Sequence, residues 1–282
     1  MPPRQPRPIP PLLRLPLELR QQIYSYLLPR ENVSHPLPSV GITSVSHRLP
    51  KSALLNIHPH ITDELLAYFY TITTWKLIFS HAFNFFRVDP SLANFERCTA
   101  LRWIRKVEIV FFCDILLLKN YPSFGLDKFC EEIAKRAGRA CEVLSQAKEL
   151  RVVTVSWIDT TLTGGWEQKA TILRPLRRLA EGRDITFRIG EINGPEDVDR
   201  EKFVKAVEDV LGEGRKLETG LDGAADEHEG DPSQLRMLAF DVRQERQRAM
   251  DTREMRSCGG CGGRAGDEQR EIVASAAFET LV

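Results

Sequence analysis

The sequence predicts an α/β protein with a mainly parallel β-sheet and helices packed on it, and it leaves a mixed α+β arrangement open. Between residues 71 and 212, short apolar runs alternate with longer segments whose apolar residues recur at helical spacing. The apolar runs are nearly continuous, which is typical of strands buried on both faces of a parallel sheet. The intervals between the runs are irregular, which argues against a leucine-rich repeat.

The chain opens with a proline-rich leader and a short amphipathic helix. Residues 1–11 hold six prolines among polar residues, a composition typical of a disordered leader. Residues 12–28 read LLRLPLELRQQIYSYLL. Pro16 suits the first turn of a helix, where its missing N–H has no partner to lose, and Pro29 ends the helix.

The apolar side chains of this opening helix form one stripe. Its members recur at i, i+4, i+7 and i+8: Leu19, Ile23, Tyr26 and Leu27. Polar residues are expected to face away from the stripe: Arg20, Gln21, Gln22 and Ser25. Leu15 and Leu17 flank the helix start and can pack beside the stripe. The polar leader cannot cover these side chains, so either the rest of the chain or a partner protein must do so.

A loop, a second helix and a first body strand come next. Residues 29–52 are rich in Pro, Ser and His and predict an extended loop. Thr62 or Asp63 can cap the helix that follows. Its apolar positions include Leu65, Leu66, Phe69 and Tyr70. The β-branched and aromatic run at 71–79 predicts a strand.

The body then alternates helices and strands. A helical or turn segment at 95–105 leads into a strand at 107–112. The later elements are a helix from Leu126 to Ala147, a strand at 150–157, a helix from Trp166 to Glu181 interrupted at Pro175, a strand at 184–192, and a helix from Asp199 to Leu211. The first of these helices is expected to bury Phe129, Ile133, Ala137, Ala140, Cys141 and Leu144, and the last one Phe203, Val207, Val210 and Leu211.

These assignments divide the chain into a leader at 1–11, a helical region at 12–70 with an internal loop at 29–52, an α/β body at 71–212, and a tail at 213–282. The tail is acidic, rich in glycine and poor in large apolar residues, so we expect it to be mostly disordered. Alternating charges at 234–256 leave room for one charged helix within it.

The composition of the chain argues against a nucleic-acid-binding, secreted or membrane-spanning protein. The 282 residues include 39 basic and 39 acidic ones, so no global field attracts nucleic acid or an anionic membrane. The basic residues near Arg177, Arg183 and Arg188 are interleaved with acidic ones, and we interpret them as a solvated face. No apolar run is long enough for a signal peptide or a bilayer-spanning helix. We therefore expect a protein inside the cell, in the cytoplasm, the nucleus or both, with no membrane or nucleic-acid partner.

The sequence contains no strong motif for metal binding, phosphate binding or catalysis. Cys258 and Cys261 lack the second pair of ligands that a structural zinc site needs. His58 and His60 flank a proline, which favours a helix entry over a metal site. The glycines at 164–165 can form an ordinary strand-to-helix turn, although backbone amides there could also meet an anion. We assign no catalytic, cofactor-binding or metal-binding residue, and we expect no enzyme activity.

The first 80 residues resemble a known family. Leu15, Pro16, Glu18 and Leu19, followed by Ile23, Tyr26 and Leu27, look like the first half of an F-box. The segment DELLAYFY at 63–70 and the strand from Trp75 to Phe79 extend the resemblance to the F-box-like proteins that are abundant in filamentous fungi. A tryptophan-containing second F-box helix is missing where the family has one, because the loop at 29–52 takes its place.

The resemblance implies a role in protein interaction. F-box helices dock onto a Skp-type adaptor of a cullin–RING ubiquitin ligase, and a C-terminal domain captures the substrate. The residues implied to contact the adaptor are Leu15, Pro16, Leu19, Ile23, Tyr26 and Leu27. The implied function is that of a substrate-recognition adaptor with an unknown protein target. The alternative is a self-contained α/β domain of unknown function, with a small-molecule enzyme among the options, in which the first helix only contributes to the core.

Overall fold

The computed structural model describes residues 10–34, 36, 42–79, 92–113, 125–161, 163–194 and 199–219. All of them belong to one compact unit. Most of the predicted leader lies outside this range. The predicted charged helix at 234–256 and the cysteine pair at 258 and 261 lie outside it as well.

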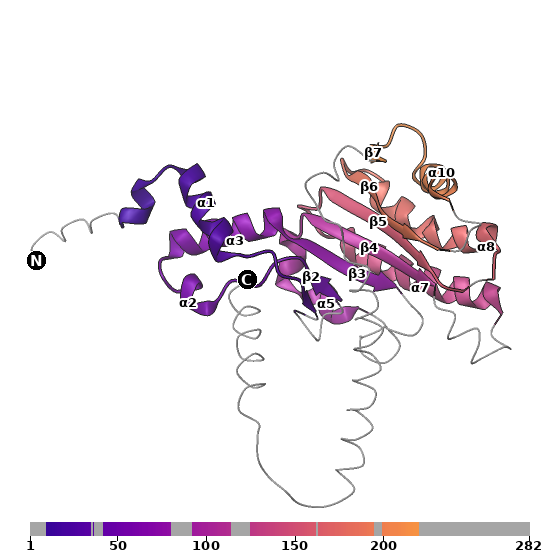
Figure 1. The fold of residues 1–282 in the computed structure, drawn as a ribbon, viewed down its shortest axis with the longest axis horizontal. Helices are drawn as coiled ribbons and strands as arrows, with labels where there is room; N and C mark the ends of the chain where they lie inside the picture. Colours follow the sequence, from indigo (N-terminus) through magenta and orange to yellow (C-terminus); the bar gives the residue numbers. More distant parts are fainter. Residues whose placement is uncertain are drawn as a thin grey trace, which may run out of the picture. The chain divides into compact units, whose positions relative to one another are not determined.

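Within the described residues, a seven-stranded sheet has its strands in the order of the sequence, from β1 to β7 (Figure 1). The strands are β1 (Val33–Ser34), β2 (Ser44–Val45), β3 (Thr74–Phe79), β4 (Lys106–Cys113), β5 (Val152–Asp159), β6 (Thr186–Asn193) and β7 (Leu217–Glu218). The pairs β1–β2 and β2–β3 are antiparallel, and the four later pairs are parallel. The predicted α/β class with a mainly parallel sheet is confirmed.

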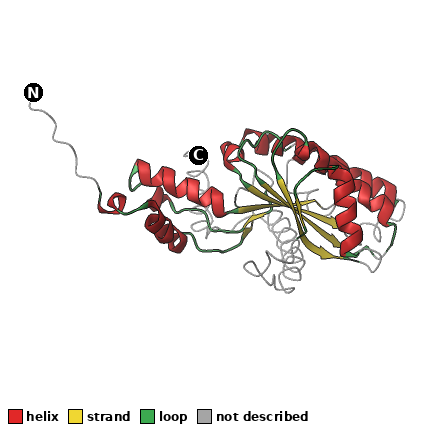
Figure 2. Cartoon of the chain, turned by 90° about the horizontal axis from the view of Figure 1, so that it is seen from above, coloured by secondary structure: helices red, strands yellow, loops and turns green. Residues whose placement is uncertain are grey.

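The helices of the described residues are η1 (Pro11–Arg14), α1 (Leu17–Leu27), α2 (Ser52–Leu55), α3 (Pro59–Ile72), α5 (Ala93–Arg97), η2 (Thr99–Trp103), α7 (Leu126–Leu144), α8 (Trp166–Ala170), η3 (Thr171–Leu176), α9 (Arg177–Ala180) and α10 (Arg200–Leu211). The helices from α5 to α10 connect successive parallel strands, whereas those up to α3 precede the first parallel strand, β3. Because the parallel strands follow one another across the sheet, right-handed crossovers place the connecting helices on one face. Figure 2 shows helices along one side of the fanned strands.

The core lies between this helical layer and the sheet. Alternate side chains of the central strands point into it, including Ile109 of β4 and Val155 of β5. On α7, the residues predicted to be inward are all buried: Phe129, Ile133, Ala137, Ala140, Cys141 and Leu144. On α10, Phe203, Val207 and Leu211 are buried, and Val210 is partly buried against the same core.

Polar groups occupy part of the opposite face of the sheet. Lys76, Glu108 and Thr154 lie opposite one another in register. The Lys76 ammonium lies 3.0 Å from the Glu108 carboxylate, and the Ser156 hydroxyl donates to that carboxylate at 3.0 Å. The Ser156 oxygen also accepts from the Glu191 N–H at 3.2 Å. These contacts tie four neighbouring strands together on the face away from the core.

Two local predictions for the N-terminal region were wrong. The segment predicted as a loop contains β1 and β2, which extend the sheet because β2 pairs with β3. Neither Thr62 nor Asp63 caps α3. The helix begins one turn earlier, at Pro59, and the His58 side chain accepts from the His60 N–H at 3.2 Å. Proline at the first helical position fixes this earlier start.

The helical segment between β5 and β6 was predicted correctly as an interrupted helix. It consists of α8, η3 and α9, and Pro175 lies within η3. Proline lacks the N–H that an α-helical hydrogen bond needs, and the tighter 3-10 turn accommodates that loss.

Candidate functional site

The first helix packs on α3 through one side only. Tyr24 and Leu28 are 1% and 2% exposed and belong to the common core. Arg20 lies on the same side and is half-buried. Its guanidinium donates to both carboxylate oxygens of Glu64 on α3, at 2.8 and 2.7 Å. Arg20 therefore faces away from the apolar stripe, as predicted, but it is turned towards α3 and not into solvent.

Glu64 is the centre of this contact. Besides the Arg20 pair, its carboxylate accepts from the Tyr24 hydroxyl at 3.0 Å and lies 3.2 Å from His60 Nε2. The hydrogen bonds from Arg20, and then the one from Tyr24, hold the pKa of Glu64 below its usual value. Burial, reinforced by the nearby carboxylate, raises the pKa of Tyr24 to about 12. The carboxylate and the phenol are thus held charged and neutral, respectively, at pH 7.

The first helix and the residues before it leave large apolar side chains in solvent, most of them on the side away from Tyr24. The exposed ones are Leu15 (36%), Leu17 (45%), Leu19 (44%), Tyr26 (86%) and Leu27 (43%). We call Leu15, Leu19, Ile23, Tyr26 and Leu27 the apolar face of α1. Pro16 is exposed beside it, and Ile23 is half-buried. Five of the six residues implied by the F-box resemblance are therefore accessible to a second molecule.

The helix that carries this face is set by local sequence. Pro16 occupies the N-cap, one position before the predicted first turn, and its side chain can offer no hydrogen bond to the helix start. Glu18 in the first turn compensates, because a carboxylate interacts favourably with the positive end of the helix dipole. The N–H of Leu28 donates to the Tyr24 carbonyl, which closes the last turn just before Pro29.

A second cluster lies at the carboxyl end of β5 and is wholly internal. Lys169 of α8 is 0% exposed, and its ammonium lies 2.7 Å from Asp159 Oδ2 and 2.8 Å from Thr161 Oγ1. Thr161 in turn donates its hydroxyl and its N–H to Asp159 Oδ1, at 2.6 and 2.9 Å. A buried charge is tolerated when it is paired and hydrogen-bonded, as here. No local pattern indicates this pair, because Lys169 lies in a polar stretch of helix.

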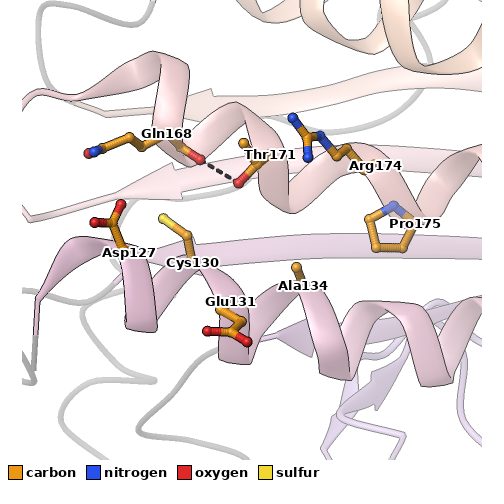
Figure 3. A pocket seen from close by; sticks show the side chains of 8 residues that line it. All are labelled: Asp127, Cys130, Glu131, Ala134, Gln168, Thr171, Arg174 and Pro175. Carbon is orange, nitrogen blue, oxygen red and sulfur yellow. Dashed lines mark hydrogen bonds between the residues drawn. The ribbon is translucent and has the colours of Figure 1, made fainter.

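A shallow cavity of about 370 Å³ adjoins this cluster between α7 and the α8–η3 segment. Figure 3 shows Asp127, Cys130, Glu131 and Ala134 of α7 facing Gln168, Thr171, Arg174 and Pro175 across it. Burial raises the pKa of Cys130 to about 11 and also raises the pKa of Cys113. Both thiols are therefore protonated at neutral pH and are weak nucleophiles.

The remaining sequence motifs have structural explanations. Gly164 and Gly165 adopt positive φ angles of 62° and 76° and form the turn that leads into α8. His58 caps α3. Among the described side chains, no group of three or more His, Cys, Asp or Glu residues is placed to share a metal ion. The helices of the described ranges also lack a segment with the length and apolar character needed to cross a bilayer.

Comparison of the chain with protein-family models, with curated proteins and with solved structures gives no significant match.

Proposed function

We propose that the chain is an F-box-like interaction protein whose first helix docks onto a Skp-type adaptor of a ubiquitin ligase. The observation that carries this proposal is the orientation of α1. Its polar and aromatic residues Arg20 and Tyr24 contact α3, whereas Leu19 and Tyr26 are left in solvent. A helix that only served its own core would bury the apolar stripe instead.

The apolar face suits a protein partner. Aromatic and leucine side chains that are exposed together mark interaction sites, because burying them against a second apolar surface is favourable. Tyr26 adds a phenol that can bury its ring and still hydrogen-bond at the edge of an interface. In this proposal, the α/β body recognises a protein target, and the complex acts inside the cell, in the cytoplasm or the nucleus. No enzymatic step is assigned to this chain.

The test is capture of a purified Skp-type adaptor by the full-length chain. Leu19→Asp and Tyr26→Asp each place a charge on the apolar face without touching the α3 contact. Ser25→Asp is the matched control, because Ser25 is exposed, adjacent to Tyr26, and points away from the face. We expect each face variant to weaken capture by roughly tenfold or more, as for an interface anchor, while the control binds like the wild type.

Two results would contradict the proposal. One is a wild-type chain that fails to capture the adaptor at all. The other is equal capture by Tyr26→Asp and Ser25→Asp, because a contact through the apolar face cannot be indifferent to a carboxylate in place of the tyrosine ring. Melting temperatures of all variants show whether the fold is kept.

A further inference from the structure

Arginines and lysines gather at the amino end of the parallel sheet. The segments that lead into β4, β5, β6 and β7 are 102–106, 148–151, 183–185 and 213–216. Together they hold eight basic residues and three acidic ones, in a chain whose total charge is zero. We call Arg105, Lys148, Arg151, Arg215 and Lys216 the basic edge.

Hydrogen bonds between the strand starts hold these residues side by side. The N–H groups of Arg151 and Val152 both donate to the Arg105 carbonyl, at 2.9 and 3.1 Å. Thr186 N–H donates to the Arg151 carbonyl at 2.8 Å, and Phe187 N–H donates to the Lys216 carbonyl at 2.9 Å. Neighbouring strands are about 4.8 Å apart, so the edge from β4 to β7 spans roughly 15 Å, the reach of about five residues of extended peptide.

Part of this positive charge has a structural role. Arg183 donates to the Ala147 carbonyl at 2.9 Å and to the Ser145 carbonyl, both of which follow the last turn of α7. Such a contact satisfies carbonyls at the negative end of a helix. We therefore leave Arg183 out of the basic edge.

Four of the five residues of the basic edge are exposed, and the fifth, Arg105, donates to the Thr71 hydroxyl at 2.8 Å. Arg151 and Lys216 are 60% and 67% exposed. Glu149 lies 3.9 Å from both Arg105 and Arg151, which is a long separation for an exposed ion pair. Asp184, 2.9 Å from Lys216, is 81% exposed. Exposed pairs of this kind contribute little, so an external carboxylate can replace either acid at small cost.

We propose that the basic edge binds an acidic peptide segment of a partner protein, which runs across the strand ends. Three of its five residues are arginines, whose planar guanidinium groups suit bidentate contacts with carboxylates. The positive charge at this edge already stabilises one carboxylate. Lys216, and to a smaller extent Arg151, lowers the pKa of Asp184. The surface is separate from the apolar face of α1, and its binding does not depend on the adaptor.

The surface fits a peptide better than a nucleic acid. Glu149 and Asp184 interrupt the row of positive charges and would repel a continuous phosphate backbone. Single-stranded nucleic acids are held by several aromatic side chains that stack on bases. Trp103 is exposed near this edge, but the Arg102 guanidinium already lies over its ring, 5.8 Å from the centroid.

Fluorescence anisotropy with the full-length chain at low ionic strength tests the proposal. The probe is a fluorescein-labelled peptide of alternating glutamate and serine, compared with the same peptide carrying glutamine and with labelled oligothymidylate. Arg151→Ala combined with Lys216→Ala should weaken binding of the glutamate peptide by about fivefold. Lys128→Ala combined with Lys202→Ala removes two exposed charges in the first turns of α7 and α10, and it should leave the affinity unchanged.

Three results would overturn the proposal. The glutamate peptide could fail to bind more tightly than the glutamine peptide, which would leave the basic edge as a solvated surface. The control variant could lose as much affinity as the edge variant, which would show that binding is spread over the whole chain. Tighter binding of oligothymidylate than of the glutamate peptide would assign the edge to nucleic acid instead.

Discussion

Arg20 and Glu64 form a two-point contact between the first and third helices, with Nε–Oε2 at 2.8 Å and Nη2–Oε1 at 2.7 Å. A bidentate guanidinium–carboxylate pair fixes direction as well as distance. It therefore sets the rotation of α1 about its own axis. With Arg20 turned towards α3, the residues on the far side of the helix, Leu19 and Tyr26 among them, stay in solvent.

Because of this contact, we expect the stability of the α1–α3 pair to decrease at acidic pH. The pKa of Glu64 is lowered in the folded chain from a reference of 4.5. Its carboxylate therefore contributes stability that is fully present above about pH 4.5 and is lost as the pH falls through the lower, folded-state pKa. We expect Glu64→Gln to be less stable than the wild type at pH 7 and to lose this difference in stronger acid.

Urea unfolding at a series of pH values checks this. Asp63→Asn is the control, since Asp63 precedes Glu64 on α3 and its side chain is exposed. A constant difference between the wild type and Glu64→Gln from pH 7 down to pH 3 would show that the Glu64 charge does not stabilise the fold.

The two sides of α1 should respond differently to the same substitution. Leu28 is 2% exposed, and Leu28→Ala should cost roughly 2–5 kcal/mol of unfolding free energy because it leaves a cavity. Leu19 is 44% exposed, and Leu19→Ala should change the unfolding free energy by less than about 0.5 kcal/mol. Chemical denaturation of the two variants measures both values. A loss for Leu19→Ala as large as that for Leu28→Ala would favour the alternative in which the first helix only contributes to the core.

The buried Lys169–Asp159 pair should show strong coupling. Lys169→Met leaves the Asp159 carboxylate without its ammonium partner in a site that is 0% exposed, which should cost roughly 3–5 kcal/mol. Adding Asp159→Asn removes that isolated charge, so the double variant should be more stable than Lys169→Met alone. Unfolding free energies of the wild type, both single variants and the double variant give the coupling. Additive effects would mean that the two side chains do not interact in solution.

The sequence predicted the elements whose signals are local. The buried positions of α7, from Phe129 to Leu144, repeat at helical spacing over about four turns and could be assigned without any tertiary information. Proline likewise located the break at η3. Two-residue strands give no such periodicity. β2 is defined by its pairing with β3, tens of residues further along the chain, and β1 by its pairing with β2.

The same limit applies to the candidate site. The apolar stripe of α1 was visible as a pattern, because its residues lie within one helix. The packed side of α1 could not be predicted from the sequence. Arg20 and Tyr24 face inward because they bind Glu64, which is 44 residues from Arg20 in the chain. Helical spacing shows which residues share a side, but not which side meets the rest of the protein.

Two glycines should respond to alanine in opposite directions. At Gly190 of β6, an added Cβ would collide with the Ser156 hydroxyl and lie 2.9 Å from Thr154 Cγ2. The Ser156 hydroxyl is held by Glu108 and Glu191, so it cannot move without losing those hydrogen bonds. We expect Gly190→Ala to cost about 1–3 kcal/mol, as in other overpacked sites.

Gly138 is the matched control, because it lies inside α7 with nothing within 4 Å of an added Cβ. Alanine there restricts the unfolded chain and favours the helix, which should stabilise the protein by about 0.5–1 kcal/mol. Thermal unfolding of both variants measures the two signs. If Gly190→Ala were neutral, β6 would have to shift away from β5 at low cost, and the network from Ser156 through Glu108 to Lys76 would not constrain the sheet.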